Sequence, residues 1–446
     1  MTIGWDAVAD VDWSRLFHAY GAATDTPAQL RALTGEDAAA RGHAVDHLWG
    51  AVLHQGTPWA VTAPAALVVA GLLADPATGA PIAEGEAPLR ATLLHFLGRV
   101  AEAGQPELGD DELHAMAFPA DVDERAVRAA WDAMLDGDCD CAYDEDCTCD
   151  DDPEADSADD EDVPEPDPDL IAKATDAIMA RVVVDIRSAA AALLPPVEAA
   201  FTDGDPRVRV NAVDAASSLL ALPGLRGRRG AVAAKVEQAA RRAVHRDERA
   251  ALVLSLGYLG DKPRGHLADP DPAVRACAAL APTLADDEAA TEELLTALRR
   301  PAEADRWFTD RPPQIRAHVR FALLDAVLRR VADFERLLPA AVAIAAVTTP
   351  ACADWDWGRL LAAAFPSPVT RPRRPRASPT PSAPTCARWW PTRSCGTPGA
   401  ATPGWRSTRS GCRTTATPAA VWPNRRRDRL MATRRPSVTP ARRDPS

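Results

Sequence analysis

The stretches DGDPRVRVNAVDAASSLLAL (203–222) and LADPDPAVRACAALAPTL (267–284) share an Asp-Pro-x-Val-Arg core followed by an alanine-rich apolar run. In the first stretch, Asp205 is suited to cap the N-terminus of a helix, and Pro206 to fill its first position, where no amide donor is missed. Arg209 follows four residues after the aspartate, so its side chain returns to the same helix face. We therefore expect a capped helix whose arginine reaches the capping turn of a neighbouring repeat.

The second stretch repeats this arrangement with Asp271, Pro272 and Arg275, and TGEDAAARGHAVDHLWGAV (34–52) keeps the acid-to-arginine spacing without the proline. Several separations between comparable arginines lie near the roughly 40–47 residues of two-helix repeats. A separation of 81 would hold one weak repeat plus an insertion, and one of 26 does not fit the period. These arginines are Arg41, Arg90, Arg128, Arg209, Arg249, Arg275 and Arg316, and the successive separations are 49, 38, 81, 40, 26 and 41 residues.

In these residues the chain resembles the HEAT repeat family. The resemblance is closest over 203–222 and 267–284, weaker over 34–98, and rests on helical pattern alone elsewhere up to about residue 365. It implies an all-α fold, a HEAT-like α-α superhelix (solenoid) of helical hairpins, in which small alanines permit close helix packing. Separate helical bundles are the alternative architecture.

Apolar residues recur at helical spacing almost everywhere before residue 366, as in DERAVRAAWDAML (123–135) and PQIRAHVRFALLDAVLRRV (313–331). Alternating strand patterns are hard to find, so the whole body is predicted to be helical. We expect two groups of HEAT-like repeats, residues 1–137 and 170–366, with an acidic disordered loop, residues 138–169, between them. A disordered Arg/Pro-rich tail, residues 367–446, is expected to follow.

Charge is distributed very unevenly along the chain. The whole protein has a formal net charge of −14, but residues 138–169 carry −17 and residues 367–446 carry +15. The remaining body, 1–137 and 170–366, therefore carries −12. An acidic body argues against binding to the phosphates of nucleic acid.

Four cysteines lie close together in the acidic loop: Cys139, Cys141, Cys147 and Cys149. Four thiolates match the ligand number of a tetrahedral zinc site, which makes zinc a candidate cofactor. However, structural zinc sites usually pair cysteines as Cys-x-x-Cys, and nearby carboxylates raise the pKa of thiols. Three hypotheses remain open: a structural metal clip, opportunistic metal or disulfide chemistry, and an inert acidic linker.

The sequence contains no phosphate-binding loop, dinucleotide fingerprint, zinc-protease helix motif or nucleophile elbow. His43 and His47 stand four residues apart on a predicted helix, where two histidines can share a metal. A third ligand and a general base are not evident, so both are interpreted as ordinary surface or core histidines.

The resemblance implies a non-enzymatic protein-protein interaction scaffold, or a regulatory or immunity-type binding protein, that recognises a protein partner through its surface. HEAT-like enzymes are the alternative: a lyase that attaches bilins, or a glycosylase that removes alkylated bases from DNA. The longest apolar run, AAVAIAAV (340–347), is too short to cross a bilayer, and the N-terminus lacks the pattern of a secretory signal. We therefore expect a cytoplasmic protein that binds neither nucleic acid nor membrane.

The tail has the composition of a GC-rich gene read out of frame. After Val369 it lacks Ile, Phe, Tyr, Glu, Lys, Gln and His altogether. GC-rich synonymous codons can be assigned to residues 377–416 and then read in the frame that starts at the last base of each codon. One protein sequence that this frame allows contains the amphipathic segment AQRAHLRALVADEELW. This segment resembles the helices of the body, so we infer a frameshift near Thr370 in place of a genuine basic tail.

Resequencing the gene from independent clones tests this inference. We expect an insertion or deletion near codon 370, after which the frame restores acidic and aromatic residues. The same intact frame in every clone would show that the basic tail is genuine.

Overall fold

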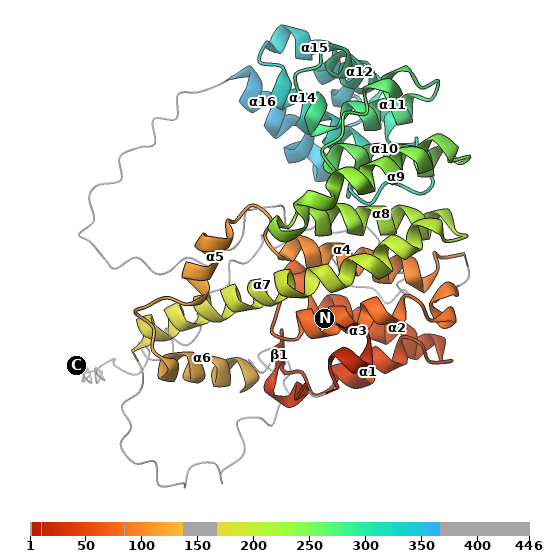
Figure 1. The fold of residues 1–446 in the computed structure, drawn as a ribbon. Coiled ribbons are helices and arrows are strands. Elements are labelled where there is room, and N and C mark those ends of the chain that lie inside the picture. The colour runs from red at the N-terminus through yellow and green to blue at the C-terminus, as the bar shows by residue number, and fades with distance from the viewer. Residues whose placement is uncertain (1, 10, 84, 137–166, 366–446) are drawn as a thin grey trace, which may run out of the picture. The chain divides into compact units, whose positions relative to one another are not determined.

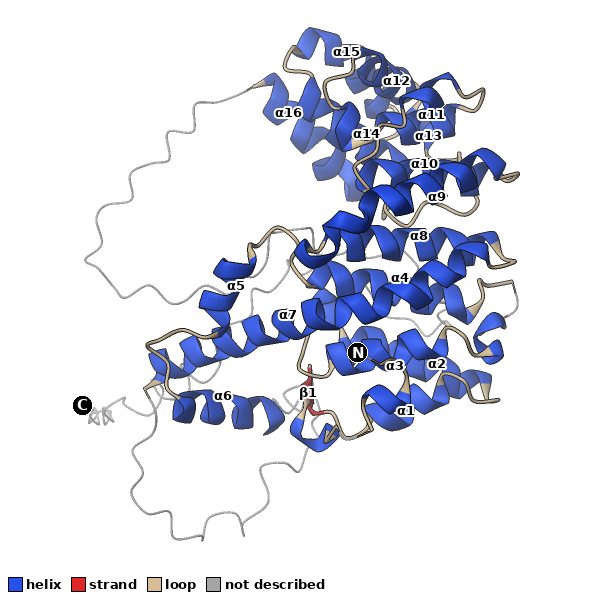
Figure 2. Ribbon diagram, in the orientation of Figure 1, coloured by secondary structure: helices blue, strands red, loops and turns tan. Residues whose placement is uncertain are grey.

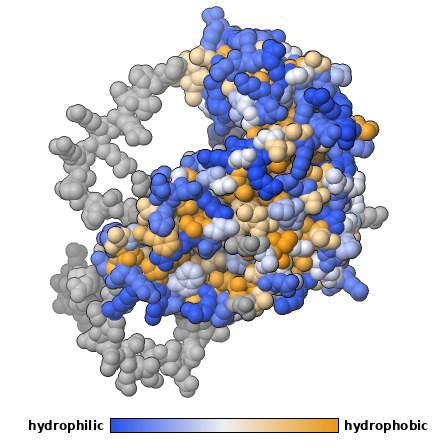
Figure 3. All heavy atoms as spheres, viewed as in Figure 1, coloured by the Kyte–Doolittle hydropathy of each residue, from blue (hydrophilic) through white to orange (hydrophobic). Residues whose placement is uncertain are grey.

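The computed structural model describes residues 2–9, 11–83, 85–136 and 167–365 (Figure 1). Within these ranges helices dominate, and the strands β1 (Phe17–His18) and β2 (Gly21–Ala22) form one short antiparallel pair (Figure 2). The predicted all-α fold class is thereby confirmed. Hydrophobic and hydrophilic residues are interspersed on the face drawn in Figure 3.

The helices fall on both sides of the acidic segment in sequence. Those before it are α1 (Thr26–Ala32), α2 (Ala38–His47), α3 (Thr62–Leu72), α4 (Leu89–Ala103), α5 (Asp110–Ala117) and α6 (Glu124–Asp136). Those after it are α7 (Pro168–Ala199), α8 (Pro206–Ala221), α9 (Arg229–Arg242), α10 (Arg246–Tyr258), α11 (Pro272–Ala279), α12 (Glu288–Leu298), α13 (Pro301–Ala304), α14 (Val319–Arg330), α15 (Phe334–Ala345) and α16 (Arg359–Ala364).

The two predicted groups of repeats share one hydrophobic core. Helix α4 packs against α8, and α7 packs against α3, α4 and α8, so elements from before and after the acidic segment interleave. Small residues allow the close approach: a Cβ atom added to Gly98 of α4 would lie 3.1 Å from the Cα atom of Ala215 in α8. A Cβ atom on Gly257 of α10 would lie 2.6 Å from the Cβ atom of Ala281, at the end of α11, and only glycine fits there.

Asp205 and Asp271 are the N-cap residues of α8 and α11. Each accepts a hydrogen bond of 2.8 Å from the backbone N–H two residues further on. Pro206 and Pro272 fill the first helical positions, as the sequence predicts. Asp37 caps α2 in the same way, at 2.9 Å and without a proline. The three helices therefore begin where the motif places them.

The arginine four residues after each of these caps folds back over its own capping turn. Its Nη1 atom donates to the carbonyl oxygens of the two residues before the cap, at 2.7 and 3.1 Å for Arg209, 2.9 and 3.1 Å for Arg275, and 2.8 and 3.0 Å for Arg41. The expectation that these arginines reach the turn of a neighbouring repeat is therefore wrong. The spacing of four residues places the guanidinium next to its own turn, where two carbonyl groups need donors.

The other nitrogens of Arg209 and Arg275 donate to carboxylates of other helices. Arg209 binds both oxygens of Glu248 in α10, at 2.7 and 2.8 Å. Arg275 donates to Glu293 in α12 at 2.9 Å. Each arginine thus joins its own helix turn to a carboxylate of another helix.

Arg90 and Arg249 do reach a neighbouring capping turn. Arg90 of α4 donates to Asp203 at 2.6 Å, and Arg249 of α10 pairs with Asp269 at 3.2 Å. Asp203 and Asp269 stand two residues before the caps of α8 and α11, and each also accepts the backbone N–H of the cap residue at 2.9 Å. These contacts connect α4 and α10 to the turns before α8 and α11.

We call the four pairs the arginine ladder. Its members are Arg90–Asp203, Arg209–Glu248, Arg249–Asp269 and Arg275–Glu293. They join α4 to the turn before α8, α8 to α10, α10 to the turn before α11, and α11 to α12. Both side chains of every pair are at most 26% exposed, so solvent screens these pairs less than surface ion pairs.

Three arginines of the predicted series do not join the ladder, and Arg41, which within the described ranges donates only to its own capping turn, is the first. Arg128 is 73% exposed on α6 and only approaches Glu124 of the same helix, at 3.5 Å. Arg316 lies outside any helix, because α14 begins at Val319 and not near residue 313 as predicted. A hydrogen bond from the N–H of Ile315 to the carbonyl of Pro312 closes a turn there instead.

The boundary of the acidic segment also differs from the prediction. Helix α7 begins at Pro168, inside the predicted loop 138–169. Asp167 caps this helix by accepting the N–H of Asp169 at 3.0 Å, so the last carboxylates of the run belong to a helix start. Residues 137–166 and the tail from 366 onward lie outside the described residues.

Arg209→Ala tests the ladder. The substitution leaves the carboxylate of Glu248, only 6% exposed, without its cation, and we expect the free energy of unfolding to fall by about 3 kcal/mol. The matched control Arg128→Ala removes an exposed pair and should change it by less than about 0.5 kcal/mol. Urea denaturation measures both changes, and equal effects would show that the ladder has no special role.

Candidate functional site

A segment of 14 residues without helix or strand, Asp305–His318, joins α13 to α14, and we call it the strap. Connections of this length inside a compact fold are uncommon and often functional. The strap contacts α10 and α4, two helices far away in sequence. Trp307 and Ile315 anchor it to the protein, with 8% and 5% of their surfaces exposed, and Pro312 is also buried.

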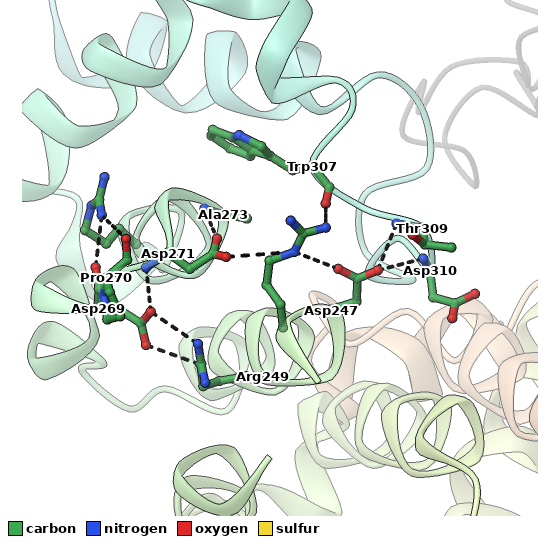
Figure 4. Close-up of polar contacts among 11 residues, drawn as sticks. Asp247, Arg249, Asp269, Pro270, Asp271, Ala273, Trp307, Thr309 and Asp310 are labelled. Atoms are coloured by element: carbon green, nitrogen blue, oxygen red, sulfur yellow. Dashed lines mark hydrogen bonds and ion pairs between the residues drawn. The ribbon is translucent and has the colours of Figure 1, made fainter. Parts of the chain in front are cut away.

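The first half of the strap binds the start of α10 through its backbone (Figure 4). The carboxylate of Asp247 accepts the N–H groups of Thr309 and Asp310, at 2.8 and 2.9 Å. The guanidinium of Arg246 donates to the carbonyl oxygen of Trp307. These contacts recognise main-chain groups, so they do not depend on the side chains that the strap carries there.

The second half of the strap inserts Gln314 between helices. Its Nε2 atom donates to Ser255 Oγ of α10 at 2.9 Å. Its Oε1 atom is buried and finds no hydrogen-bond partner among the described residues. A buried acceptor without a donor costs roughly 1–3 kcal/mol, so glutamine is an imperfect occupant of this position.

Asp214 of α8 lies beside Gln314 and is itself buried. Burial raises the pKa of Asp214 to about 7, and the neighbouring carboxylate of Glu102 adds to the increase. The cation of Arg99 and a side-chain hydrogen bond with Gln314 act in the opposite direction. A buried carboxyl group with a strongly raised pKa is typical of sites that bind or react with another group.

The strap reaches α4 through Arg316. Its guanidinium donates to both oxygens of Glu102, at 3.0 and 2.7 Å, and Arg99 of α4 also donates to Glu102. Arg316 is 51% exposed, so this pair contributes little to stability by itself. The carboxylates of Asp247, Asp214 and Glu102 thus all lie next to the strap, and we call this set the strap face.

The structure places Arg209 and Arg275 of the predicted motif in the ladder, and none of the motif residues in the strap face. Asp205, Pro206 and Arg209 build the start of α8, and Asp271 with its following proline builds that of α11. The sequence interpretation missed the strap face because its members come from α4, α8, α10 and the strap. Two adjacent prolines, Pro312 and Pro313, were the only local signal of a break in the helical pattern.

The predicted zinc ligands Cys139, Cys141, Cys147 and Cys149 lie outside the described residues. Within the described ranges, no group of three or more His, Cys, Asp or Glu side chains could hold a metal ion. His43 is exposed on α2, so it does not join His47 in a site.

His47 belongs to a buried polar cluster next to the β1–β2 pair. His18 accepts the N–H of Tyr20 on Nδ1 at 3.0 Å, so its Nε2 carries the proton and donates to Asp25 at 3.2 Å. His47 Nε2 lies 2.9 Å from the hydroxyl oxygen of Thr26, and burial lowers the pKa of His47. Thr26 has no exposed surface, so a substrate cannot reach its hydroxyl group and the cluster is structural.

A cavity of about 490 Å³ lies between α11, α12 and α14. Its charged lining includes Asp286, Glu288, Arg329 and Arg330, and the guanidinium of Arg330 already donates to the carbonyl of Ala279 at 2.8 Å. Because the wall carries both acids and bases, its charge does not favour a ligand of one sign.

Comparisons with known proteins add no relative to this picture. No model of a known protein family matches the chain, and no curated protein matches it. None of the described helices is long and apolar enough to cross a membrane.

Asp214→Asn tests the electrostatics of the strap face. Because the folded pKa of about 7 lies above the ordinary value of 3.8, the stabilising effect of the neutral carboxyl is complete below pH 3.8 and is lost as pH rises toward 7. The free energy of unfolding of the wild type should therefore fall, relative to the variant, by up to about 1.4 kcal/mol per pH unit in this window.

Urea denaturation from pH 4 to pH 8 measures this difference. Asp132→Asn, an exposed position on α6, serves as the control and should follow the wild type. Parallel pH profiles of wild type and Asp214→Asn would show that Asp214 titrates normally in the folded protein.

Proposed function

We propose that this protein is a non-enzymatic scaffold, a HEAT-like solenoid that binds a protein partner for a structural, regulatory or immunity-type purpose. The observation that carries the proposal is the strap face, where the helices already hold an irregular stretch of polypeptide. Asp247 binds two of its N–H groups, and Glu102 binds its arginine. A surface that binds one polypeptide segment in this manner has the chemistry needed to bind another.

The arginine ladder supports the same proposal. Repeated pairs such as Arg90–Asp203 and Arg249–Asp269 join one repeat to the next in the same way. Repetition of a local contact builds an extended surface, which is how solenoid proteins bind their partners.

The acidic charge of the body supports a protein partner over nucleic acid. The alternative of a base-excising enzyme would need a basic, aromatic-lined surface, whereas the strap face carries Asp247, Asp214 and Glu102. A bilin lyase, the other alternative, would bind an acidic tetrapyrrole, which these carboxylates would repel.

Affinity capture with the full-length protein tests the proposed function. We expect one protein to be recovered in stoichiometric amount, identified by mass spectrometry, and to bind the purified scaffold again in isolation. A heat-unfolded bait is the control for non-specific adsorption. If the native bait instead retains DNA or a bilin and no protein in stoichiometric amount, the scaffold proposal is wrong.

A further inference from the structure

We propose that the strap face binds an extended, basic segment of a partner protein, and that the strap is the intramolecular competitor of this segment. The inference rests on the proposed function and adds the chemistry of the partner. The segment carries a basic residue above Asp214, an apolar residue next to it, and an arginine above Glu102. In the strap these three positions are Gln314, Ile315 and Arg316.

The strap is bound as a peptide would be bound. Its contacts with α10 and α4 join residues separated by 59 to 214 positions in the chain. Asp247 and Arg246 bind its backbone, and Ile315 fills an apolar position with 5% of its surface exposed. The same groups can receive the backbone and an apolar side chain of another polypeptide.

The fit of the strap is poorest at Gln314. The Oε1 atom of Gln314 is buried without a donor among the described residues, and Asp214 beside it receives no cation from the strap. A lysine or arginine at this position removes the unpaired acceptor and supplies a cation to the carboxylate. A partner segment with a basic residue here therefore fits better than the strap itself.

The second half of the strap is held by an exposed ion pair, whereas its first residue, Asp305, pairs with the buried Arg320 of α14. Arg316 and Glu102 are 51% and 37% exposed. Exposed ion pairs contribute little to stability, so a better segment can replace residues 314–316 at low cost, while Asp305 keeps the start of the strap in place. The charge of the face selects the replacement, because Glu102 and Asp214 both favour a cation.

Two fluorescein-labelled peptides probe the site: the strap sequence DRWFTDRPPQIRAH and the same peptide with Gln314→Arg. Fluorescence anisotropy at pH 8, above the pKa of Asp214, measures their binding to the full-length protein. We expect the arginine peptide to bind about tenfold more tightly, which corresponds to about 1.4 kcal/mol.

Three variants of the full-length protein sharpen the test. Asp214→Asn should abolish the preference for the arginine peptide. Arg316→Glu, which repels Glu102 and loosens the strap, should increase the affinity for both peptides. Gln314→Arg, which improves the fit of the strap, should decrease it about tenfold. Arg128→Ala, on the exposed face of α6, should bind as the wild type does, and circular dichroism verifies that each variant is folded.

The proposal is overturned if neither the wild type nor Arg316→Glu binds the peptides saturably, or if the preference for arginine persists in Asp214→Asn. Such a result would make the strap a structural tie and remove the strap face as support for the scaffold function, which affinity capture with the full-length protein tests separately. Failure of capture with successful peptide binding would contradict the scaffold function alone.

Discussion

The fold depends on a guanidinium group held four residues after a helix cap. The aspartate cap fixes the start of the helix, and the arginine of the next turn donates to the two carbonyl groups just before the cap, as Arg209 and Arg275 do. In Arg209 and Arg275 this contact fixes the position of the guanidinium, and the remaining nitrogens donate to a carboxylate of another helix. One local geometry therefore orients both the helix start and the contact between helices.

The starts of α8 and α11 could be predicted from sequence, because caps are local. Asp205 and Asp271 each act on a backbone group two residues away, and such short distances are visible in a motif. The partners of the arginines were missed, although a signal was present: both motif stretches carry a second aspartate two residues before the cap, Asp203 and Asp269. Arg128 was included in the arginine series only because of its spacing along the chain. It lies four residues after Glu124 on the same helix, but both side chains are exposed and the arginine reaches no other described helix.

The strap face could not be predicted, because its members meet only after the helices have packed. Helical spacing in residues 313–331 is real, but the contacts of Gln314 and Arg316 with distant helices hold the first residues outside the helix. Burial of Asp214 is likewise a product of packing: in the sequence it stands in an ordinary helical position, and only the neighbouring α4 and strap remove its water. Long-range contacts of this kind leave no local pattern.

The position of the acids in the ladder also defines the unit that duplication or recombination can exchange. Each arginine and the carboxylate that binds it lie on different elements, as with Arg209 in α8 and Glu248 in α10. A gene segment cut between those helices would carry an arginine without its acid, or an acid without its arginine, into its new position. An exchangeable module that keeps its ion pair therefore runs from one arginine through the element that holds its acid, for example from α8 through α10, and its boundaries lie outside the linked pair.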